Sequence, residues 1–465
     1  MIKLSDTIAA IATGMNQGGI GVIRVSGEHA ISITDSIFVP KKNGKEIRNL
    51  ESYTAAYGNI VKQFNNDEIE VIDEVIVLVM KAPSTYTKED VVEIDCHGGM
   101  QVMNHILHLL LQKGARLAEP GEFTKRAFLN GRIDLSQAES VMDLISAKSD
   151  LAVKTALSQL KGSLKDKIVE LRQEIIHNLA YIESALDDPE HYDLDGFDEE
   201  LDGLLEKEEK EIRHLIQNAD NGKMMKEGIH TVILGKPNAG KSSVLNVLMG
   251  KDRAIVTDIA GTTRDTLEEF ISINGIPLNI VDTAGIRDTE DIVEKIGVDK
   301  SIEAMEEADL ILYIVDSSIP LDENDYQIMD KIRNRQVIIL QNKSDLEMVV
   351  TKEEIKNHLD KMIIDISAKE KTGFDTFYQE LNDMFFQGSL SYNDEIYITN
   401  VRHKNALEEA LSAIVMVRQS IADGMPEDFL SIDLMAAYER LGYIIGESVE
   451  DDLVDTIFRE FCMGK

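Results

Sequence analysis

The sequence predicts a multidomain protein of mixed α/β and helical structure, in which a P-loop domain is inserted into a helical domain. Its 465 residues exceed what one hydrophobic core usually holds. Apolar, β-branched runs alternate with helical segments between about residues 231 and 386, whereas helical periodicity dominates on both sides of that stretch. We therefore expect a parallel sheet with right-handed crossover helices, flanked by two parts of one helical domain.

Changes in periodicity divide the chain into four stretches. Residues 1–120 combine strand patterns such as Val75–Met80 with a helical pattern over Val102–Leu111, which is typical of an α/β domain. Residues 121–219 are helical, with an acidic linker or broken helix at Asp187–Asp202. Residues 220–386 form the inserted α/β domain, and residues 387–465 are helical again. Apolar residues recur three or four apart at Leu164, Ile168, Leu171, Ile175, Leu179 and Ile182.

The chain is strongly acidic, because 84 Asp and Glu residues oppose 48 Lys and Arg residues and give a net charge of −36. Such a field repels phosphate backbones, so we expect a basic partner to hold any RNA substrate. The longest apolar runs are too short to cross a membrane, and no targeting pattern opens the sequence, which favours a cytoplasmic protein. The two cysteines, Cys96 and Cys462, indicate neither a disulfide framework nor a metal site.

A phosphate-binding loop follows the predicted strand Thr231–Leu234 and precedes a helical pattern. Its glycines let backbone amides turn toward phosphates, and the helix N-terminus adds the positive end of its dipole. Lys241 is expected to contact the β- and γ-phosphates, and the Ser242 hydroxyl is expected to ligate Mg²⁺. The loop reads Gly235-Lys236-Pro237-Asn238-Ala239-Gly240-Lys241-Ser242.

Three further motifs follow in the order that a guanine-nucleotide domain requires. A predicted strand ends at Asp282-Thr283-Ala284-Gly285, where Asp282 would hold Mg²⁺ through water and Gly285 would sense the γ-phosphate. In Asn342-Lys343-Ser344-Asp345, the Asp345 carboxylate accepts two hydrogen bonds that guanine offers and adenine does not. Ser367-Ala368-Lys369 supplies a backbone contact to the guanine oxygen. With the P-loop, these motifs predict a Ras-like G domain that binds and hydrolyses GTP.

The hydrolytic machinery departs from that of small signalling GTPases. Gly261-Thr262-Thr263-Arg264-Asp265 occupies the place of the first switch, with Thr263 as the second hydroxyl for Mg²⁺. Ile286 stands where those enzymes carry the glutamine that orients water, so a carboxylate or amide from the loop Arg287–Glu294 is needed instead. An arginine finger from this chain is left open between Arg264 and Arg287, both of which also suit a solvated switch loop.

Six features of the chain occur together: Gly21–Gly27, Pro120–Gly131, Asp134–Glu139, the P-loop with Asn238, Thr257–Asp265 and the ending Phe461–Lys465. On these features the chain resembles the MnmE (TrmE) family of tRNA-modification GTPases over essentially its whole length. The resemblance implies a homodimer whose N-terminal domain binds 5-formyltetrahydrofolate or a related folate as one-carbon donor. It also implies an MnmG-type partner that uses FAD and NADH, in a heterotetramer or a larger complex. With that partner, family members add an aminomethyl or carboxymethylaminomethyl group to C5 of the wobble uridine of certain tRNAs.

The same resemblance implies that K⁺ beside the phosphates replaces the arginine finger, with Asn238, Thr257, Ile259 and Thr262 as ligands. It assigns the water-orienting carboxylate to Glu294, so that the implied catalytic set is Glu294, Lys241 and Asn238. Together, motifs and resemblance give the expected GTP contacts: Asn238, Ala239, Gly240, Lys241, Ser242, Ser243, Thr257, Asp258, Ile259, Ala260, Gly261, Thr262, Thr263, Asp282, Thr283, Ala284, Gly285, Asn342, Lys343, Asp345, Ser367, Ala368 and Lys369.

For the folate, the matching positions are Arg24, Glu93, Arg132 and Lys465. Arg132 departs from the lysine often found there in the family, which keeps the charge and changes the donor geometry. Met463 replaces the usual isoleucine of the tail. The role of Cys462 is left open between a nucleophile and a thiol packed against the C-terminal helix. The alternative function is a regulatory GTPase that assembles ribosomal particles without chemistry on RNA, since it would share every G-domain motif.

Overall fold

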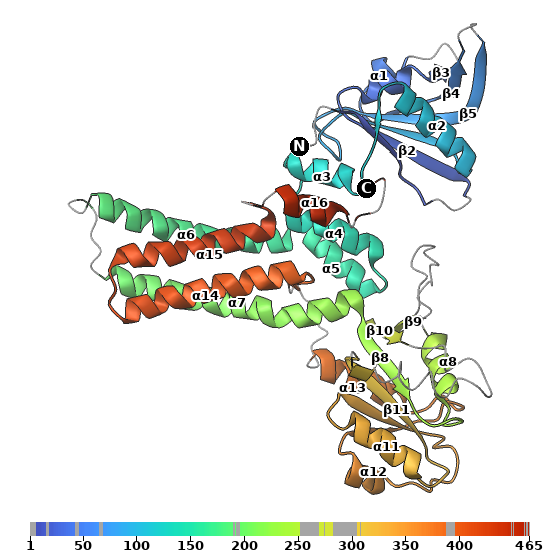
Figure 1. The fold of residues 1–465 in the computed structure, drawn as a ribbon, viewed down its shortest axis with the longest axis vertical. Helices are drawn as coiled ribbons and strands as arrows, with labels where there is room; N and C mark the ends of the chain where they lie inside the picture. Colours follow the sequence, from blue (N-terminus) through green and yellow to red (C-terminus); the bar gives the residue numbers. More distant parts are fainter. Residues whose placement is uncertain are drawn as a thin grey trace. The chain divides into compact units, whose positions relative to one another are not determined.

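The computed structural model describes residues 6–14, 18–41, 46–64, 68–188, 191, 196–251, 269–273, 275–281, 305–306, 308–386, 396–447, 449, 451–459, 461 and 464. Two compact units are recognised, one of Met1–Met142, Leu164–Glu170 and Leu441–Lys465, the other of Asp143–Ser163 and Leu171–Arg440. The predicted combination of an N-terminal α/β domain, a helical domain and a P-loop G domain is confirmed (Figure 1).

The N-terminal α/β domain is built on one mostly antiparallel sheet. Within the described residues it has seven strands in the order β3-β4-β5-β6-β2-β1-β7. The short 3₁₀ turn Ile47–Asn49 leads into its longest hairpin, β4–β5. The strands are β1 Ile8–Ile11, β2 Ile20–Ser26, β3 Phe38–Pro40, β4 Thr54–Gln63, β5 Ile69–Met80, β6 Val91–His97 and β7 Arg116–Leu117.

The helices α1 (Ala30–Asp35) and α2 (Met100–Gln112) pack on one face of this sheet. Alternate residues of the strands, such as Ile23 and Val25, are fully buried under them, because side chains of a strand point to opposite faces in turn. Arg24 therefore points to the opposite face. Near β1 that face is covered by Phe123 of α3 (Glu122–Leu129), which packs with Ile8.

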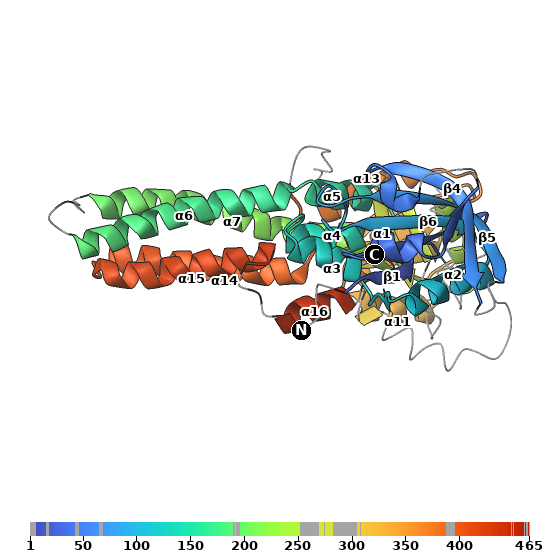
Figure 2. The ribbon, with the colours of Figure 1, turned by 90° about the horizontal axis from the view of Figure 1, so that it is seen from above.

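The long helices α6, α7, α14 and α15 lie side by side (Figures 1 and 2). The predicted apolar stripe from Leu164 to Ile182 is buried. The break between α6 and α7 is shorter than predicted, because Gly196 with a φ of 79° starts α7 at Phe197 rather than after Asp202. The remaining helical elements are α4 Leu135–Ser146, α5 Asp150–Leu160, α6 Ser163–Asp187, α7 Phe197–Glu227, α14 Val401–Ala422, α15 Glu427–Ile445 and α16 Asp451–Arg459.

The G domain is a largely parallel sheet between helices. Within the described residues its six strands run in the order β13-β12-β11-β8-β10-β9, and β9 alone among them pairs antiparallel with its neighbour. The strands are β8 Ile229–Leu234, β9 Glu269–Ile273, β10 Ile276–Val281, β11 Leu310–Asp316, β12 Val337–Asn342 and β13 Met362–Asp365. The helices are α8 Lys241–Lys251, α11 Glu323–Ile332, α12 Lys352–His358 and α13 Phe374–Phe386.

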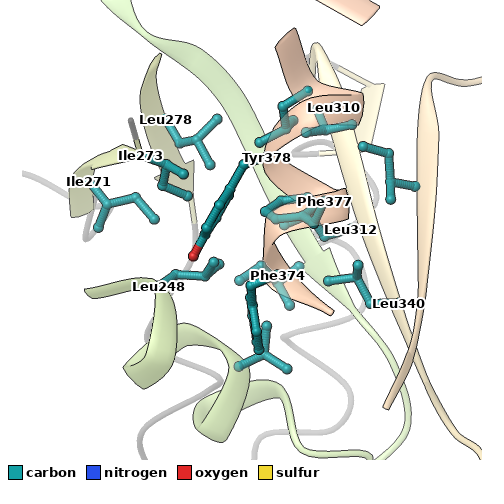
Figure 3. Packing of buried hydrophobic residues seen from close by; sticks show 14 of the residues in the cluster. Leu248, Ile271, Ile273, Leu278, Leu310, Leu312, Leu340, Phe374, Phe377 and Tyr378 are labelled. Atoms are coloured by element: carbon teal, nitrogen blue, oxygen red, sulfur yellow. The ribbon is translucent and has the colours of Figure 1, made fainter. Parts of the chain in front are cut away.

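Every residue of β11 and β12 is buried, as expected for central parallel strands covered on both faces. On one face, the rings of Phe374, Phe377 and Tyr378 from α13 pack among leucines and isoleucines of the strands (Figure 3). Leu248 of α8 joins the same cluster. This core fixes the carboxyl ends of β8, β11, β12 and β13, where ligands of such sheets bind.

Candidate functional site

The P-loop joins β8 to α8 and adopts backbone conformations that its sequence makes possible. Gly235 has a φ of 150°, and a Cβ atom there would lie 2.4 Å from the carbonyl oxygen of Ile314. Gly240 has a φ of 99°, and its Cβ would lie 2.2 Å from Asn342 Nδ2. Any larger residue at either position would displace backbone or motif atoms, so both glycines are needed for the shape of the loop. Asn238 has a φ of 64°, a region that asparagine tolerates.

The side chain of Lys241 is hydrogen-bonded to the backbone of the P-loop. Its Nζ donates hydrogen bonds to the carbonyl oxygens of Gly235 at 2.7 Å and Lys236 at 2.9 Å. Burial lowers the pKa of this ammonium group. A phosphate oxygen at this position would supply the negative charge that the two carbonyl dipoles provide only in part.

Asn342 connects three of the predicted motifs. Its Nδ2 donates to the carbonyl oxygen of Ala239 in the P-loop at 2.9 Å, and its Oδ1 accepts from the backbone amide of Ala368 at 3.1 Å. The side chain is buried, so these bonds are shielded from water. The phosphate loop and both guanine-binding loops are therefore tied together by one amide group.

Asp345 is oriented by the neighbouring loop. Its Oδ1 accepts a hydrogen bond from Ser367 Oγ at 2.6 Å, and this bond holds the pKa of the carboxyl group below its usual range. Lys369 Nζ lies 3.9 Å from the other oxygen. The group thus stays a carboxylate, the form that accepts two hydrogen bonds from guanine.

Lys343 supports this arrangement from the other side of the same motif. Its Nζ lies 2.5 Å from Asp316 Oδ2, at the end of β11. Burial works against the charge of Asp316, yet hydrogen bonds from Lys343 and Ser318 hold the pKa of this carboxyl group below normal. No sequence motif singled out Asp316, although its place at the end of a buried strand next to the binding edge is a usable signal.

An open pocket of about 500 Å³ lies between α8 and the loop after β13. Three predicted GTP contacts, Ser243, Ala368 and Lys369, line it. The pocket therefore brings together residues that are separated by more than a hundred positions in the chain. Its complete lining is Ser243, Asn246, Val247, Gly250, Ala368, Lys369 and Lys371.

Several predicted residues lie outside the described part of the chain. The strand β10 ends at Val281, directly before the first residue of the second switch motif. The first switch motif ends at Asp265, and β9 begins at Glu269. The predicted residues outside the described ranges are Thr257, Asp258, Ile259, Ala260, Gly261, Thr262, Thr263, Arg264, Asp282, Thr283, Ala284, Gly285, Ile286, Arg287, Glu294, Cys462, Met463 and Lys465.

A second cluster forms on the N-terminal sheet. Arg24 and Glu93 are direct neighbours on β2 and β6, and Arg24 Nε donates to Glu93 Oε1 at 2.8 Å. Arg24 Nη1 also donates to the carbonyl oxygen of Gly464 at 3.3 Å. The guanidinium carbon lies 5.6 Å from the centre of the Phe123 ring. Two of the four predicted folate residues thus contact each other, and one of them, Arg24, also contacts the C-terminal tail.

The tail fits this place because of Gly464. This glycine is buried with a φ of 85°, and a Cβ atom would lie 2.3 Å from the carbonyl oxygen of Ile11. Gly121 makes a similar close approach, since its Cβ would lie 2.7 Å from the carbonyl oxygen of Phe458 in α16. The two glycines allow the end of the chain to lie against the N-terminal sheet.

Arg132 lies beside Tyr86, which packs against the apolar cluster that contains Ile8 and Phe123. Its guanidinium stacks 4.7 Å from the centre of the Tyr86 ring and donates to the Tyr86 carbonyl oxygen at 3.0 Å. Tyr86 packs with Phe123, so one pair of aromatic rings lies beside both predicted arginines. Phe123 belongs to the segment Pro120–Gly131 that carries the family resemblance, whereas nothing in the sequence singled out Tyr86.

Other kinds of site find no support in the described residues. No group of three or more His, Cys, Asp or Glu side chains gathers there into a metal site. None of the described helices is both long and apolar enough to cross a bilayer.

Comparisons with known proteins identify the family of the chain. The family model "GTP-binding protein TrmE N-terminus" matches residues 7–132, and the family model "MnmE helical domain" matches residues 135–462. A tRNA modification GTPase MnmE of Lachnoclostridium phytofermentans is 55% identical over 461 residues, which cover 99% of this chain and 100% of that protein. The chain belongs to the MnmE family.

Other MnmE proteins match over similar lengths. The tRNA modification GTPase MnmE of Clostridioides difficile is 48% identical over 467 residues, with 99% of this chain and 100% of that protein covered. Among solved structures, an Aquifex aeolicus Era variant bound to GDP and AlF₄⁻ is 28% identical, covers 40% of this chain and 66% of its own, and gives a TM-score of 0.26. The two family models and the MnmE relatives confirm the resemblance of the sequence to the MnmE family.

Proposed function

We propose that this MnmE-family chain is a K⁺-stimulated GTP hydrolase that acts in tRNA modification. With an MnmG-type FAD partner, it would add an aminomethyl or carboxymethylaminomethyl group to C5 of the wobble uridine of certain tRNAs. The proposal rests on the hydrogen bonds of Arg24 to Glu93 and to the C-terminal tail, in a chain whose G domain also joins the P-loop to the guanine-binding motifs through Asn342. A tRNA substrate also agrees with the expected cytoplasmic location.

In the nucleotide site, Lys241 pairs with the β- and γ-phosphates after leaving the two carbonyl groups it now contacts. Asp345 accepts the guanine N1–H and amino group, and the backbone of Ser367–Lys369 contacts the guanine oxygen. Ser242, at the start of α8, would hold Mg²⁺ together with Thr263 and, through water, Asp282. When bound, Mg²⁺ neutralises the charge that develops on the phosphate oxygens.

For hydrolysis, we propose K⁺ ligands at Asn238, Thr257, Ile259 and Thr262, and a water-orienting carboxylate at Glu294. Hydrolysis is expected to be faster in K⁺ than in Na⁺ at equal ionic strength. Equal rates in the two salts, or an unchanged rate in Asn238→Ala, would reject the K⁺ site.

Glu294→Ala provides a separate test of the catalytic carboxylate. A residue that orients water acts in the transition state, so the hydrolysis rate should fall while GTP affinity stays nearly constant. A large loss of affinity with normal turnover would instead make Glu294 a structural residue.

For the folate, we propose contacts from Arg24, Glu93, Arg132 and Lys465. The chemistry of the described donors suits such a ligand: guanidinium groups pair with the glutamate carboxylates, and Glu93 accepts hydrogen bonds from amino groups of the pterin. Bound folate would supply the one-carbon unit. The half-buried ring of Tyr86 offers apolar surface beside Arg132, and the buried ring of Phe123 packs beside Arg24.

The proposed assembly is a homodimer joined with an MnmG-type protein that uses FAD and NADH. A net charge of −36 supports a role for that partner in holding most of the tRNA. Wobble nucleosides from cells with and without the chain provide the decisive measurement. Loss of the C5-modified uridines is expected. Unchanged nucleosides, no binding of reduced folate and association with ribosomal subunits would favour a ribosome-assembly GTPase instead.

A further inference from the structure

Lys236, the second residue of the P-loop, directs its side chain away from the phosphate cradle and onto the helix α11. Its Nζ lies 2.6 Å from Asp325 Oδ2 and 2.9 Å from Asp322 Oδ2. The Lys236 side chain is only 13% exposed, so its ion pair with Asp325 is largely shielded from solvent, whereas Asp322 is 53% exposed. The P-loop motif does not specify the side chain at this position, and the proposed mechanism gives that side chain no role.

The acceptor of the ion pair is rigidly held. The Asp325 side chain is 3% exposed, and its Oδ1 accepts a hydrogen bond from the fully buried hydroxyl of Tyr313 in β11 at 2.9 Å. Its Oδ2 also accepts from the Asp322 backbone amide at 3.0 Å, which completes a capping box at the start of α11. Lys236 is thus tied to a helix terminus and to a central strand at once.

The backbone of the same residue faces the nucleotide site. The carbonyl oxygen of Lys236 accepts from Lys241 Nζ at 2.9 Å and from the Ala239 amide at 3.3 Å. The side chain and the carbonyl group of one residue therefore connect α11 to the lysine that contacts phosphate. A shift of this peptide would change where Lys241 Nζ lies.

We propose that Lys236 is a positioning residue for the triphosphate, whose ion pair with Asp322 and Asp325 fixes the P-loop peptide that receives Lys241. Without the Lys236 ammonium group, Asp325 is left as a buried charge short of one partner, and the P-loop peptide that receives Lys241 loses its tie to α11. Burial opposes the charge on Lys236, but hydrogen bonds to Asp325 and Asp322 raise the pKa of its ammonium group, so the pair stays ionised at neutral pH.

The test replaces Lys236 in the full-length chain. Lys236→Met keeps the aliphatic stem and removes the charge, so we expect about tenfold weaker GTP and GDP binding, with KM raised in parallel and kcat within about twofold. Lys236→Arg should restore most of the affinity. Lys331→Met is the matched control, since it removes one exposed charge from the last turn of the same helix and should leave affinity unchanged.

A purely structural role gives a different result. If the melting temperature of Lys236→Met falls while its GTP and GDP affinities equal those of the parent, the proposal is overturned. Asp322→Asn provides a second variant should Lys236→Met not fold, because asparagine caps a helix as well as aspartate does and only the charge is lost. This variant should weaken nucleotide binding about two- to threefold, and unchanged affinity would count against the proposal.

Discussion

The G domain and the N-terminal domain assemble their sites in different ways. In the G domain, Asn342 joins neighbouring loops at one edge of a parallel sheet, and each loop carries a motif that is recognisable by itself. In the N-terminal domain, Arg24 meets Gly464, 440 residues away along the chain, and the aromatic side chains between the predicted residues belong to no binding motif. A site formed by motifs that set the backbone conformation can therefore be predicted from the sequence. A site formed by side chains that are distant along the chain can be recognised only in the folded structure.

The largest change in ligand affinity is expected from Asp345→Asn in the nucleotide site of the G domain. The substitution replaces the acceptor of two charge-assisted hydrogen bonds, each worth about 1.5–3 kcal/mol, so GTP affinity should fall about 10²- to 10⁴-fold. Calorimetric titration with GTP and ATP checks the change. Folate binding to the same variant is the internal control, since the N-terminal cluster shares no described contact with Asp345. A loss below tenfold would mean that the guanine contact is dispersed over other groups.

The alkylation rate of the Cys96 thiol reports how readily the N-terminal sheet opens. Its Sγ donates to the Gly21 carbonyl oxygen at 3.3 Å, and burial raises the pKa of the thiol to about 11. At pH 8 roughly one thiol in a thousand is then a thiolate, so alkylation in the native protein should be about a hundredfold slower than that of a free cysteine. The rate should rise about tenfold per pH unit up to that pKa.

Labelling is followed in a Cys462→Ser background, so that only one thiol reports. Alkylation of Cys96 as fast as that of free cysteine would indicate that the sheet opens readily. The proposed folate site on this sheet would then lack the fixed strand pairing between Arg24 and Glu93 on which its geometry depends.

Gly464→Ala tests the distant contact of the N-terminal site. An added Cβ would lie 2.3 Å from the Ile11 carbonyl oxygen, so the tail cannot occupy its place, and folate affinity should fall about tenfold. Gly424→Ala is the matched control, because Gly424 also has a positive φ, of 64°, but has no atom within 4 Å of its Cβ position. GTP hydrolysis should be unaffected by either change. Normal folate affinity in Gly464→Ala would show that the tail is dispensable for binding.

The smallest effect is expected from Arg132→Lys. Lysine keeps the positive charge and loses the stacked guanidinium over Tyr86, a contact worth about 0.5–1 kcal/mol, so folate affinity should change about two- to fivefold. Fluorescence titration with 5-formyltetrahydrofolate is sensitive enough for this range. A loss beyond thirtyfold would indicate that the planar fork of the guanidinium itself pairs with a folate carboxylate.

Much of the nucleotide site was predictable from the sequence because its motifs specify local backbone geometry. The glycines at 235 and 240 permit positive φ values, and the strand before them and the helix after them follow from short-range periodicity. The apolar runs Leu310–Val315 and Val337–Leu340 likewise indicated strands, and both lie in fully buried strands of the sheet. Arg24 and Glu93 were predicted as well, but through the family resemblance rather than through a local pattern.

The sequence by itself determined the G domain, the guanine preference of its motifs and the family of the chain, since each rests on motifs whose own residues are close together along the chain. Tertiary structure alone decided that Asn342 contacts Ala239 across 103 positions, that Lys236 pairs with Asp325, and that Gly464 lies against Ile11. Periodicity specifies which face of an element is buried, but not which element covers it. That choice is made by packing and by the pairing of buried polar groups, whose partners are neighbours only in the folded molecule.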